Sequence, residues 1–312
     1  MAGPPIGRED VERAAGVIAG RLHRTPTFSA RSLGEGLHLK AELFQRTGSF
    51  KPRGVLNRLA SLTPDERAAG VISVSAGNHA QALAWGATQE GLSSLLVMWQ
   101  GADSAKVAAT RAYGAEVDQH AVDPAGAFRR LEELRSATGR TFVHPFDDPL
   151  VLAGQGTVGL EIVEDIPEVE TVVVPVGGGG LVGGIAAACA PGVRVVAVEP
   201  ETSRALHAAL DAGEPVSVEP RSLADALNAP FAGKLPIAIC GALGVEVVLV
   251  SEDEIAEAFR LLYARAKLAC EPGAAAGVAA VLAGKVEGGV TVCVVSGGNV
   301  AAATAAGILA AR

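Results

Sequence analysis

Short apolar runs rich in valine and isoleucine recur along the chain, and each is bounded by glycine, proline or polar residues. Runs of this length without strict alternation are typical of strands that are buried on both faces of a sheet. The pattern predicts strands at residues 71–74, 94–99, 141–144, 171–176, 194–198, 246–250 and 290–295.

Between these runs the apolar residues repeat with helical spacing. Helices are predicted at residues 64–70, 78–90, 104–113, 125–138, 181–190, 203–212, 252–267 and 273–283. The alternation of strands and helices predicts an α/β protein with two open, mainly parallel twisted sheets flanked by helices. Because no long linker interrupts the pattern, we expect any second domain to be inserted within the first.

Composition narrows the function classes. With 312 residues, 49% of them hydrophobic, the chain is long enough to bury a substantial core, and its net charge of −8 offers no basic field to nucleic acid. No apolar stretch reaches the roughly 18 residues of a membrane helix, so we expect a cytoplasmic protein without a membrane partner. Four widely spaced cysteines in apolar surroundings predict reduced, buried thiols rather than disulfides or metal ligands, at Cys189, Cys240, Cys270 and Cys293.

The strongest local signal is the glycine run Gly177–Gly180, which stands between a predicted strand and a predicted helix. Glycines allow a backbone turn that aims several N–H groups at one point, and the start of the helix adds a partial positive charge. The run therefore predicts a cradle for an anion such as phosphate, although a tight crossing without a ligand would need glycines too. Two nucleotide-binding alternatives are discounted, because the run has no G-K-[ST] ending and is not a clean G-x-G-x-x-G with an acidic ribose partner.

A second segment runs from residue 40 to residue 54 and places Lys51 between Phe50 and a proline. Partly apolar surroundings and a cationic neighbour such as Arg53 lower the pKa of a lysine, which makes its amine available as a nucleophile. The alternative for this segment alone is an ordinary solvated surface lysine.

Two further segments follow predicted strands. In the first, helix N–H groups could receive a carboxylate, with Ser75 or Asn78 as a cap, although His79 alone is more often structural than catalytic. In the second, Ser296 and two glycines end the last strand, which an ordinary turn would also explain. Together the four segments supply a phosphate cradle, an amine, a carboxylate pocket and a hydroxyl at strand ends, which suits a phosphorylated aldehyde cofactor and an amino acid.

These four segments, in this order and at these separations, resemble the threonine/serine dehydratase (threonine ammonia-lyase) branch of the fold type II, tryptophan synthase β-like, pyridoxal-phosphate enzymes. The resemblance extends from Arg24 to Asn299 and includes the stretches 153–157 and 270–274. It implies a large cofactor-binding domain at residues 1–66 and 146–312, a small inserted domain at 67–145 and no C-terminal regulatory domain. It also implies a homo-oligomer, either a dimer or a tetramer.

The resemblance implies a role for each candidate residue. Lys51 would bind pyridoxal 5'-phosphate as an imine, and Phe50 would lie beside the ring. The ring hydroxyl would receive a hydrogen bond from Asn78, and the pyridine nitrogen would face Ser296. The phosphate would lie on Gly177, Gly178, Gly179 and Gly180, and the substrate carboxylate on Ser75, Ala76, Gly77, Asn78 and His79.

The activity implied is β-elimination from a small hydroxy amino acid such as L-threonine or L-serine, which gives a 2-oxo acid and ammonia. Similar racemases carry a serine where this chain has Ala76, so racemisation should be weak. Open alternatives are elimination from hydroxyaspartate or phenylserine, β-replacement as in cysteine synthases, and a non-catalytic α/β binding protein.

Departures from the family pattern affect the metal and the substrate. Some relatives bind a divalent cation with two acidic residues, but only Glu199 is acidic here because the second position is Ala205, so no metal is assigned. Ala226, Asn228 and Trp99 also differ from the common residues at their positions. We therefore expect the specificity for the substrate side chain to differ from that for plain threonine.

Overall fold

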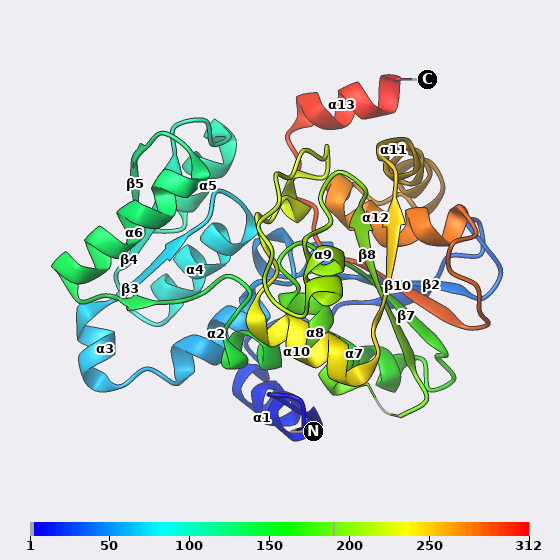
Figure 1. Cartoon of the computed structure of the whole chain (residues 1–312), viewed down its shortest axis with the longest axis horizontal. Coiled ribbons are helices and arrows are strands. Elements are labelled where there is room, and N and C mark those ends of the chain that lie inside the picture. The colour runs from blue at the N-terminus through cyan, green and yellow to red at the C-terminus, as the bar shows by residue number, and fades with distance from the viewer. Residues whose placement is uncertain (1–2, 190, 312) are drawn as a thin grey trace.

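The computed structural model describes residues 3–189 and 191–311, and it contains two open sheets that lie side by side (Figure 1). The larger sheet has the strand order β1-β2-β10-β7-β8-β9, and only β1 is antiparallel to its neighbour. Its strands are β1 (Thr27–Ser29), β2 (Leu37–Ala41), β7 (Thr171–Pro175), β8 (Arg194–Pro200), β9 (Glu246–Val250) and β10 (Thr291–Val295).

The smaller sheet has the order β5-β4-β3-β6, and all of its pairs are parallel. Its strands are β3 (Val71–Val74), β4 (Ser94–Trp99), β5 (Glu116–Ala121) and β6 (Thr141–Phe142). The predicted fold class, two mainly parallel sheets flanked by helices, is confirmed.

The helices cover both faces of the sheets, because a parallel strand needs a crossover before the next strand can pair with it. They are α1 (Arg8–Ile18), α2 (Pro52–Ala60), α3 (Pro64–Ala69), α4 (Asn78–Gln89), α5 (Ser104–Ala112), α6 (Pro124–Thr138), α7 (Pro149–Asp165), α8 (Gly180–Ala188), α9 (Ala205–Ala212), α10 (Lys234–Leu243), α11 (Glu252–Leu261), α12 (Pro272–Leu282) and α13 (Ala302–Ala310). A π-helical turn at Leu262–Ala266 follows α11. The predicted end of α8 at Ala190 lies outside the described residues.

The strands at the centre of each sheet are buried along their whole length. Every residue of β3, β7 and β10 is buried. Separate apolar clusters lie against the two faces of the large sheet, and two smaller ones lie against the small sheet. This burial explains why the central strands read as continuous apolar runs.

The large sheet combines both ends of the chain, since β2 pairs with β10 and β10 pairs with β7. All strands of the small sheet lie between residues 71 and 142, inside the segment 67–145 expected as an insert. The boundaries of the two domains at 67 and 145 stay a prediction.

Several elements were missed by the apolar pattern. Strand β5 is an edge strand with mostly half-buried polar residues, so it lacks the run of apolar residues that marks a buried strand. Strand β2 contains the fully buried Lys40, which interrupts its apolar run. Helix α7 is rich in glycine, which has a low helix propensity.

The glycines of α7 allow close packing of three helices. A Cβ atom on Gly156 would lie 2.5 Å from the carbonyl oxygen of Gly184 in α8, and one on Gly154 would lie 2.5 Å from that of Arg53 in α2. Only glycine permits such close approach of two helix backbones. The contact holds α2, and with it Lys51, against the core of the large sheet.

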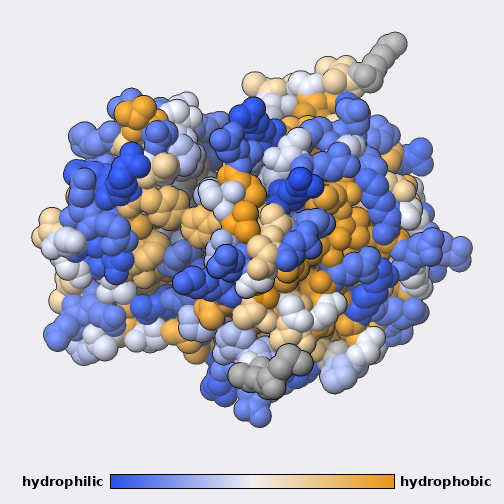
Figure 2. Space-filling view, in the orientation of Figure 1, coloured by the Kyte–Doolittle hydropathy of each residue, from blue (hydrophilic) through white to orange (hydrophobic). Residues whose placement is uncertain are grey.

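Within the described residues, no helix is long and apolar enough to cross a membrane. The four cysteines are free thiols, three of them buried and Cys189 half-buried. Hydrophilic residues cover much of the face in Figure 2, with hydrophobic residues near its centre and over the elements of the large sheet.

Candidate active site

The four predicted segments line one cavity of about 620 Å³ between the two sheets. The loop before Lys51 is joined to the end of β10, because the Phe50 N–H donates to the carbonyl of Ser296 at 3.1 Å and Gly298 donates to Gly48 at 2.9 Å. The glycine loop follows β7, and the turn that contains Ser75 follows β3. All of these segments therefore lie at the carboxyl ends of parallel strands, where open α/β sheets bind ligands.

Lys51 immediately precedes α2 and reaches into the cavity. Its Nζ donates a hydrogen bond to the carbonyl oxygen of Pro145 at 2.9 Å and lies 5.0 Å from the centre of the Phe50 ring. Burial lowers the pKa of the amine to about 8, and the charge of Glu271 opposes part of that shift. The surface location considered for this lysine is wrong, and a neutral amine is accessible near physiological pH.

Arg53 does not take part in lowering the pKa of Lys51, contrary to expectation. Its guanidinium points away from the cavity and makes paired hydrogen bonds with Glu42 and Glu161, at 2.7 to 2.9 Å. Lys40 lies beside them, with its Nζ 2.6 Å from a Glu161 oxygen. The shift at Lys51 therefore comes from burial and not from a neighbouring cation.

The glycine loop turns sharply before α8, with Gly179 in the left-handed region at φ +91°. A Cβ atom on Gly178 would lie 2.3 Å from the ring of Phe146, so only glycine fits there. Helix α8 begins at Gly180 with its first N–H groups at the cavity, which is the arrangement of an anion site. The loop therefore has the geometry of an anion cradle, and its binding of a phosphate stays a prediction.

The turn after β3 differs in detail from the expected capping arrangement. The N-cap of α4 is Gly77, without a side-chain cap, and the Ser75 hydroxyl instead accepts a hydrogen bond from the Gly77 N–H at 3.2 Å. Neither Ser75 nor Asn78 caps the helix, so that expectation is wrong. The uncapped N-terminus of α4 leaves backbone N–H groups at the cavity, which suits a carboxylate ligand.

The side chain of Asn78 is held on both sides. Its Nδ2 donates to Glu271 at 2.8 Å, and its Oδ1 accepts from Asn299 at 2.8 Å. Asn299 in turn donates to the carbonyl of Thr47 at 2.7 Å. These contacts fix the orientation of the amide at the cavity wall and leave one of its two N–H donors for a ligand.

His79 is buried, and its Nε2 lies 3.1 Å from the Ser73 hydroxyl and 3.2 Å from the carbonyl of Val143. Burial holds the pKa of His79 well below its ordinary value, and the charge of Lys51 lowers it further, so the ring is neutral. The ring therefore fastens α4 to the small sheet, while the residue also contributes to the lining of the cavity.

Glu271 was missed as a site residue, although it lies in the stretch 270–274 that carried part of the resemblance. It lines the cavity, and burial raises its pKa to about 7, with a further increase from the charge of Asp225. One of its oxygens, Oε2, has no hydrogen-bond partner among the described residues. No local pattern reveals this role, because only the fold brings Glu271 next to Asn78.

Several residues outside the four segments were also singled out in the sequence. Glu199 is buried, and its carboxylate accepts from the backbone N–H groups of Leu206 and His207, so it caps α9. Within the described residues, no group of three or more acidic, histidine or cysteine side chains is arranged for a metal ion. Trp99 and Ala226 line the cavity.

The cavity fits a phosphorylated aldehyde cofactor. It combines a buried amine of lowered pKa with a glycine cradle that no larger residue could form. Ser296 is buried at its edge, and the Ser49 hydroxyl nearby has no partner among the described residues. A covalent anchor, an anion site and spare polar groups are what such a cofactor requires.

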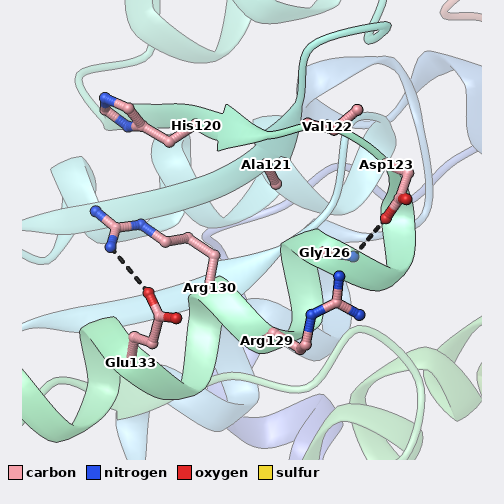
Figure 3. A pocket seen from close by; sticks show the side chains of 8 residues that line it. All are labelled: His120, Ala121, Val122, Asp123, Gly126, Arg129, Arg130 and Glu133. Atoms are coloured by element: carbon pink, nitrogen blue, oxygen red, sulfur yellow. Dashed lines mark hydrogen bonds and ion pairs between the residues drawn. The ribbon is translucent and has the colours of Figure 1, made fainter.

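A second hollow lies between the end of β5 and the start of α6, away from these segments (Figure 3). Some of its charged side chains already have partners: Arg130 pairs with Asp118 and Glu133, and Asp123 caps α6. None of its lining residues belongs to the four predicted segments.

Comparison with known proteins agrees with this site. The chain matches the family described as pyridoxal-phosphate dependent enzyme over residues 18–306. It is 41% identical over 309 residues to the catabolic L-threonine dehydratase TdcB of Escherichia coli (strain K12), with 95% of this chain and 94% of that protein covered. It is also 41% identical to the L-threonine ammonia-lyase of Thermotoga maritima, over 95% of this chain and 76% of that protein.

Solved structures show the same architecture. Maize serine racemase superposes with a TM-score of 0.91 and 32% identity, covering 96% of this chain and 95% of that one. A threonine deaminase from T.th. superposes with a TM-score of 0.88 and 38% identity, covering 95% of this chain and 99% of that one.

Proposed function

This chain belongs to the pyridoxal-phosphate dependent enzymes, and we propose that it removes the β-hydroxyl of a small hydroxy amino acid such as L-threonine or L-serine. The products are a 2-oxo acid and ammonia. The observation that carries the proposal is the position of the Lys51 amine, which shares one cavity with an anion cradle and an uncapped helix N-terminus.

The residues present can hold the cofactor at several points. Gly177–Gly180 and the N-terminus of α8 would hold its phosphate, and Lys51 would anchor its aldehyde carbon. Asn78 would offer its free N–H donor to the ring hydroxyl, and Ser296 would offer its hydroxyl to the ring nitrogen. When bound, pyridoxal phosphate supplies an electron sink for negative charge that develops at the substrate Cα.

The side chains of this protein perform the positioning and the proton transfer. The N-terminus of α4 binds the substrate carboxylate through backbone N–H groups, which orients the Cα–H bond. Lys51, whose pKa is lowered by burial to about 8, takes the Cα proton in its neutral form. The cavity lies between the two sheets, so side chains from both of them line it.

Two residues favour elimination over other reactions of the family. Ala76 lines the cavity with a methyl group, so it cannot return a proton to the opposite face of Cα. The Ser296 hydroxyl is neutral, and a neutral partner does not hold a proton on the ring nitrogen as a carboxylate would. Both features favour rapid loss of the β-hydroxyl over racemisation and transamination.

The experiment is incubation of the holoenzyme with L-threonine and with L-serine, followed by assay of 2-oxobutanoate, pyruvate and ammonia. We expect a 2-oxo acid and ammonia in equal amounts. Absence of a 2-oxo acid from every hydroxy amino acid tried would overturn the proposal, and a product formed only with an added thiol would indicate β-replacement. Reduction of the holoenzyme with borohydride and mass analysis of its peptides should place the cofactor on Lys51.

Three expectations stay predictions: the domain boundaries at 67 and 145, the homo-oligomer and the cytoplasmic location. Light scattering of the purified holoenzyme tests the oligomer directly, and a mass equal to one chain would contradict it. Limited proteolysis tests the boundaries, since cleavage near residues 67 and 145 should precede cleavage inside either sheet.

A further inference from the structure

The cavity is unusually rich in aromatic side chains. The whole chain has eight phenylalanines, two tryptophans and two tyrosines, only 4% of its residues. Four of these twelve line this one cavity, at Phe50, Trp99, Phe128 and Phe146. Phe50 lies beside Lys51, while the other three come from β4, α6 and the loop before α7. We call these three the aromatic wall.

Phe146 follows Pro145, whose carbonyl accepts a hydrogen bond from Lys51 Nζ, and the Phe146 ring packs against Gly178 of the glycine loop. His144 holds Phe146 in place: its Nδ1 accepts from the Phe146 N–H at 3.3 Å and from the Asp147 N–H at 2.9 Å. The rings of His144 and Phe146 also meet edge to face, with centroids 4.7 Å apart. The Phe146 ring is therefore fixed at the inner end of the wall.

Phe128 is connected to Phe146 through a ring behind the wall. Phe231 lies 5.5 Å from Phe146 and 6.1 Å from Phe128, measured between ring centroids. Phe128 belongs to the small sheet's covering helix, whereas Phe231 belongs to the large part of the chain. Aromatic contacts at these separations stabilise a defined arrangement of rings across the cavity mouth.

Trp99 is turned toward the cavity by an irregularity in its strand. The pairing of β4 with β5 shifts register between Val97 and Trp99, at the carboxyl end of β4. Such bulges commonly re-aim a side chain next to an active site. Trp99 and Phe128 both pack against the same apolar cluster of the small sheet, which leaves one side of each for the cavity.

The charged and amide side chains near the wall are already engaged. Lys106 pairs with Asp225 at 2.5 Å, and Asp103 accepts from the first N–H groups of α5. Asn228 does not offer the polar contact considered from the sequence, because its amide accepts from the Ser222 N–H and donates to the Ser222 carbonyl. Among the described lining residues, Lys51 is the one lysine or arginine without a carboxylate partner, which disfavours a substrate with an acidic side chain such as hydroxyaspartate.

From this arrangement we propose that the β-substituent of the substrate lies against the aromatic wall and that the preferred substrate is a β-hydroxy amino acid with an aryl group at Cβ. This inference rests on the proposed elimination reaction and specifies which class of hydroxy amino acid is its preferred substrate. For phenylserine, the Cα–H and Cβ–O bonds break and water is lost; the resulting enamine gains a proton at Cβ to become an imine, and water then adds at Cα as ammonia leaves. The net products are phenylpyruvate and ammonia, with the lost water regained.

Binding of unreactive analogues tests the wall without requiring turnover. L-Phenylalanine and L-2-aminobutyrate carry the aryl and the methyl group but no β-hydroxyl. We expect L-phenylalanine to perturb the visible absorbance of the holoenzyme with a Kd about tenfold or more below that of L-2-aminobutyrate, since added apolar groups in such a pocket give differences of this order. Equal Kd values, or tighter binding of L-2-aminobutyrate, would overturn the inference.

Turnover provides the second measurement. We expect kcat/KM for L-threo-phenylserine to exceed that for L-threonine by about tenfold or more. Phe128→Ala should lower this ratio about tenfold with little change for L-serine, whereas Phe28→Ala, which removes a ring packed under the large sheet, should leave the ratio unchanged. If Phe128→Ala does not fold, Phe128→Leu replaces it. A ratio that Phe128 substitutions do not alter would count against the wall.

The two proposals fail in different ways. If no hydroxy amino acid gives a 2-oxo acid, the proposed elimination is wrong, yet the analogue Kd values still show whether the wall selects aryl groups. If L-threonine is a better substrate than phenylserine and L-2-aminobutyrate binds at least as well as L-phenylalanine, elimination stands and the aryl preference is wrong.

Discussion

Lys51 and Arg53 are two residues apart in sequence; Lys51 is half-buried and Arg53 is buried, and they lie in opposite electrostatic surroundings. Lys51 faces a cavity where its Nζ donates to a backbone carbonyl, and burial lowers its pKa to about 8. Arg53 faces the other way, where Glu42 and Glu161 bind its guanidinium. Burial lowers its pKa, but the charges and hydrogen bonds of those carboxylates outweigh burial and raise it.

The difference shows what distinguishes a reactive cation from a structural one in the same segment. A buried charge is tolerated when carboxylates and hydrogen bonds satisfy it, as they do at Arg53. A buried amine without a carboxylate partner lowers its pKa instead and becomes a nucleophile, as Lys51 does. The two residues lie at the start of the same helix, α2, so a helix that is rigidly packed by Arg53 also holds the amine in place.

Removal of the amine should have the largest effect. Lys51→Ala should lower kcat/KM by about 10³-fold or more, because it removes both the anchor and the proton carrier. Stability should change little, since the variant loses one hydrogen bond to the Pro145 carbonyl but also a charge without a carboxylate partner. Measurement of 2-oxo acid formation beside thermal unfolding checks both expectations. An active, cofactor-bound Lys51→Ala variant would show that another residue carries the chemistry.

Removal of the structural cation should instead affect folding. Arg53→Met should lower the free energy of unfolding by about 3–5 kcal/mol, because Glu42 is left buried without its partner. Urea unfolding measures the change. Arg135→Met is the matched control, since that arginine is half-exposed and pairs with Glu132, and it should change the free energy by less than about 1 kcal/mol. If Arg53→Met and Arg135→Met lower the free energy of unfolding by similar amounts, the buried ion pair of Arg53 is not more important for folding than an exposed one.

Glu271 extends the comparison between Lys51 and Arg53, because it is a buried carboxyl group in the same cavity as Lys51. Its folded-state pKa of about 7 exceeds its ordinary value of 4.5. Well below pH 4.5 the carboxyl group is protonated in both the folded and the unfolded state, and its burial has no electrostatic cost. Above pH 7 it is ionised in both states, and burial of the charge destabilises the folded state in full. The free energy of unfolding therefore falls as the pH rises through this interval. Between about pH 4.5 and 7.5, the free energy of unfolding should fall by about 2 kcal/mol less in Glu271→Gln than in the wild type.

Unfolding of the wild type and of Glu271→Gln at about pH 4.5, 6 and 7.5 measures the difference. Glu254→Gln is the control: the Glu254 pKa is lowered, although burial acts to raise it, because Lys285 and Ser251 donate hydrogen bonds to its carboxylate. Its removal should give the opposite dependence on pH. If the free energy of unfolding changes with pH in the same way in the wild type and in Glu271→Gln, the pKa of Glu271 is not raised in the folded protein.

The smallest expected effect comes from an added hydroxyl opposite Lys51. Ala76→Ser introduces a group that can return a proton to the other face of Cα, so a trace of racemase activity should appear while elimination changes by less than about tenfold. Chiral analysis of the recovered substrate measures it. If the variant produces no D-isomer, the absence of a second proton carrier at Ala76 does not explain the reaction preference.

Much of the fold was determined by local sequence. Strands β3, β4 and β7 were predicted to within a residue at each end, because central parallel strands bury both faces and must be apolar throughout. The glycine run before α8 predicted an anion cradle for a local reason, since only glycine adopts φ +91° without strain. Elements without such a signature, such as β5 at the edge of its sheet, were not predicted.

What the sequence by itself determined is therefore the set of strand ends and glycine turns, together with the lysine that resembles a cofactor anchor. Only the tertiary structure decided how charges and rings meet across the chain. It turned Arg53 away from Lys51, placed Glu271 beside Asn78 and gathered Trp99, Phe128 and Phe146 into one wall. The physical reason is that pKa values and pocket shape depend on neighbours distant in sequence, which no local pattern encodes.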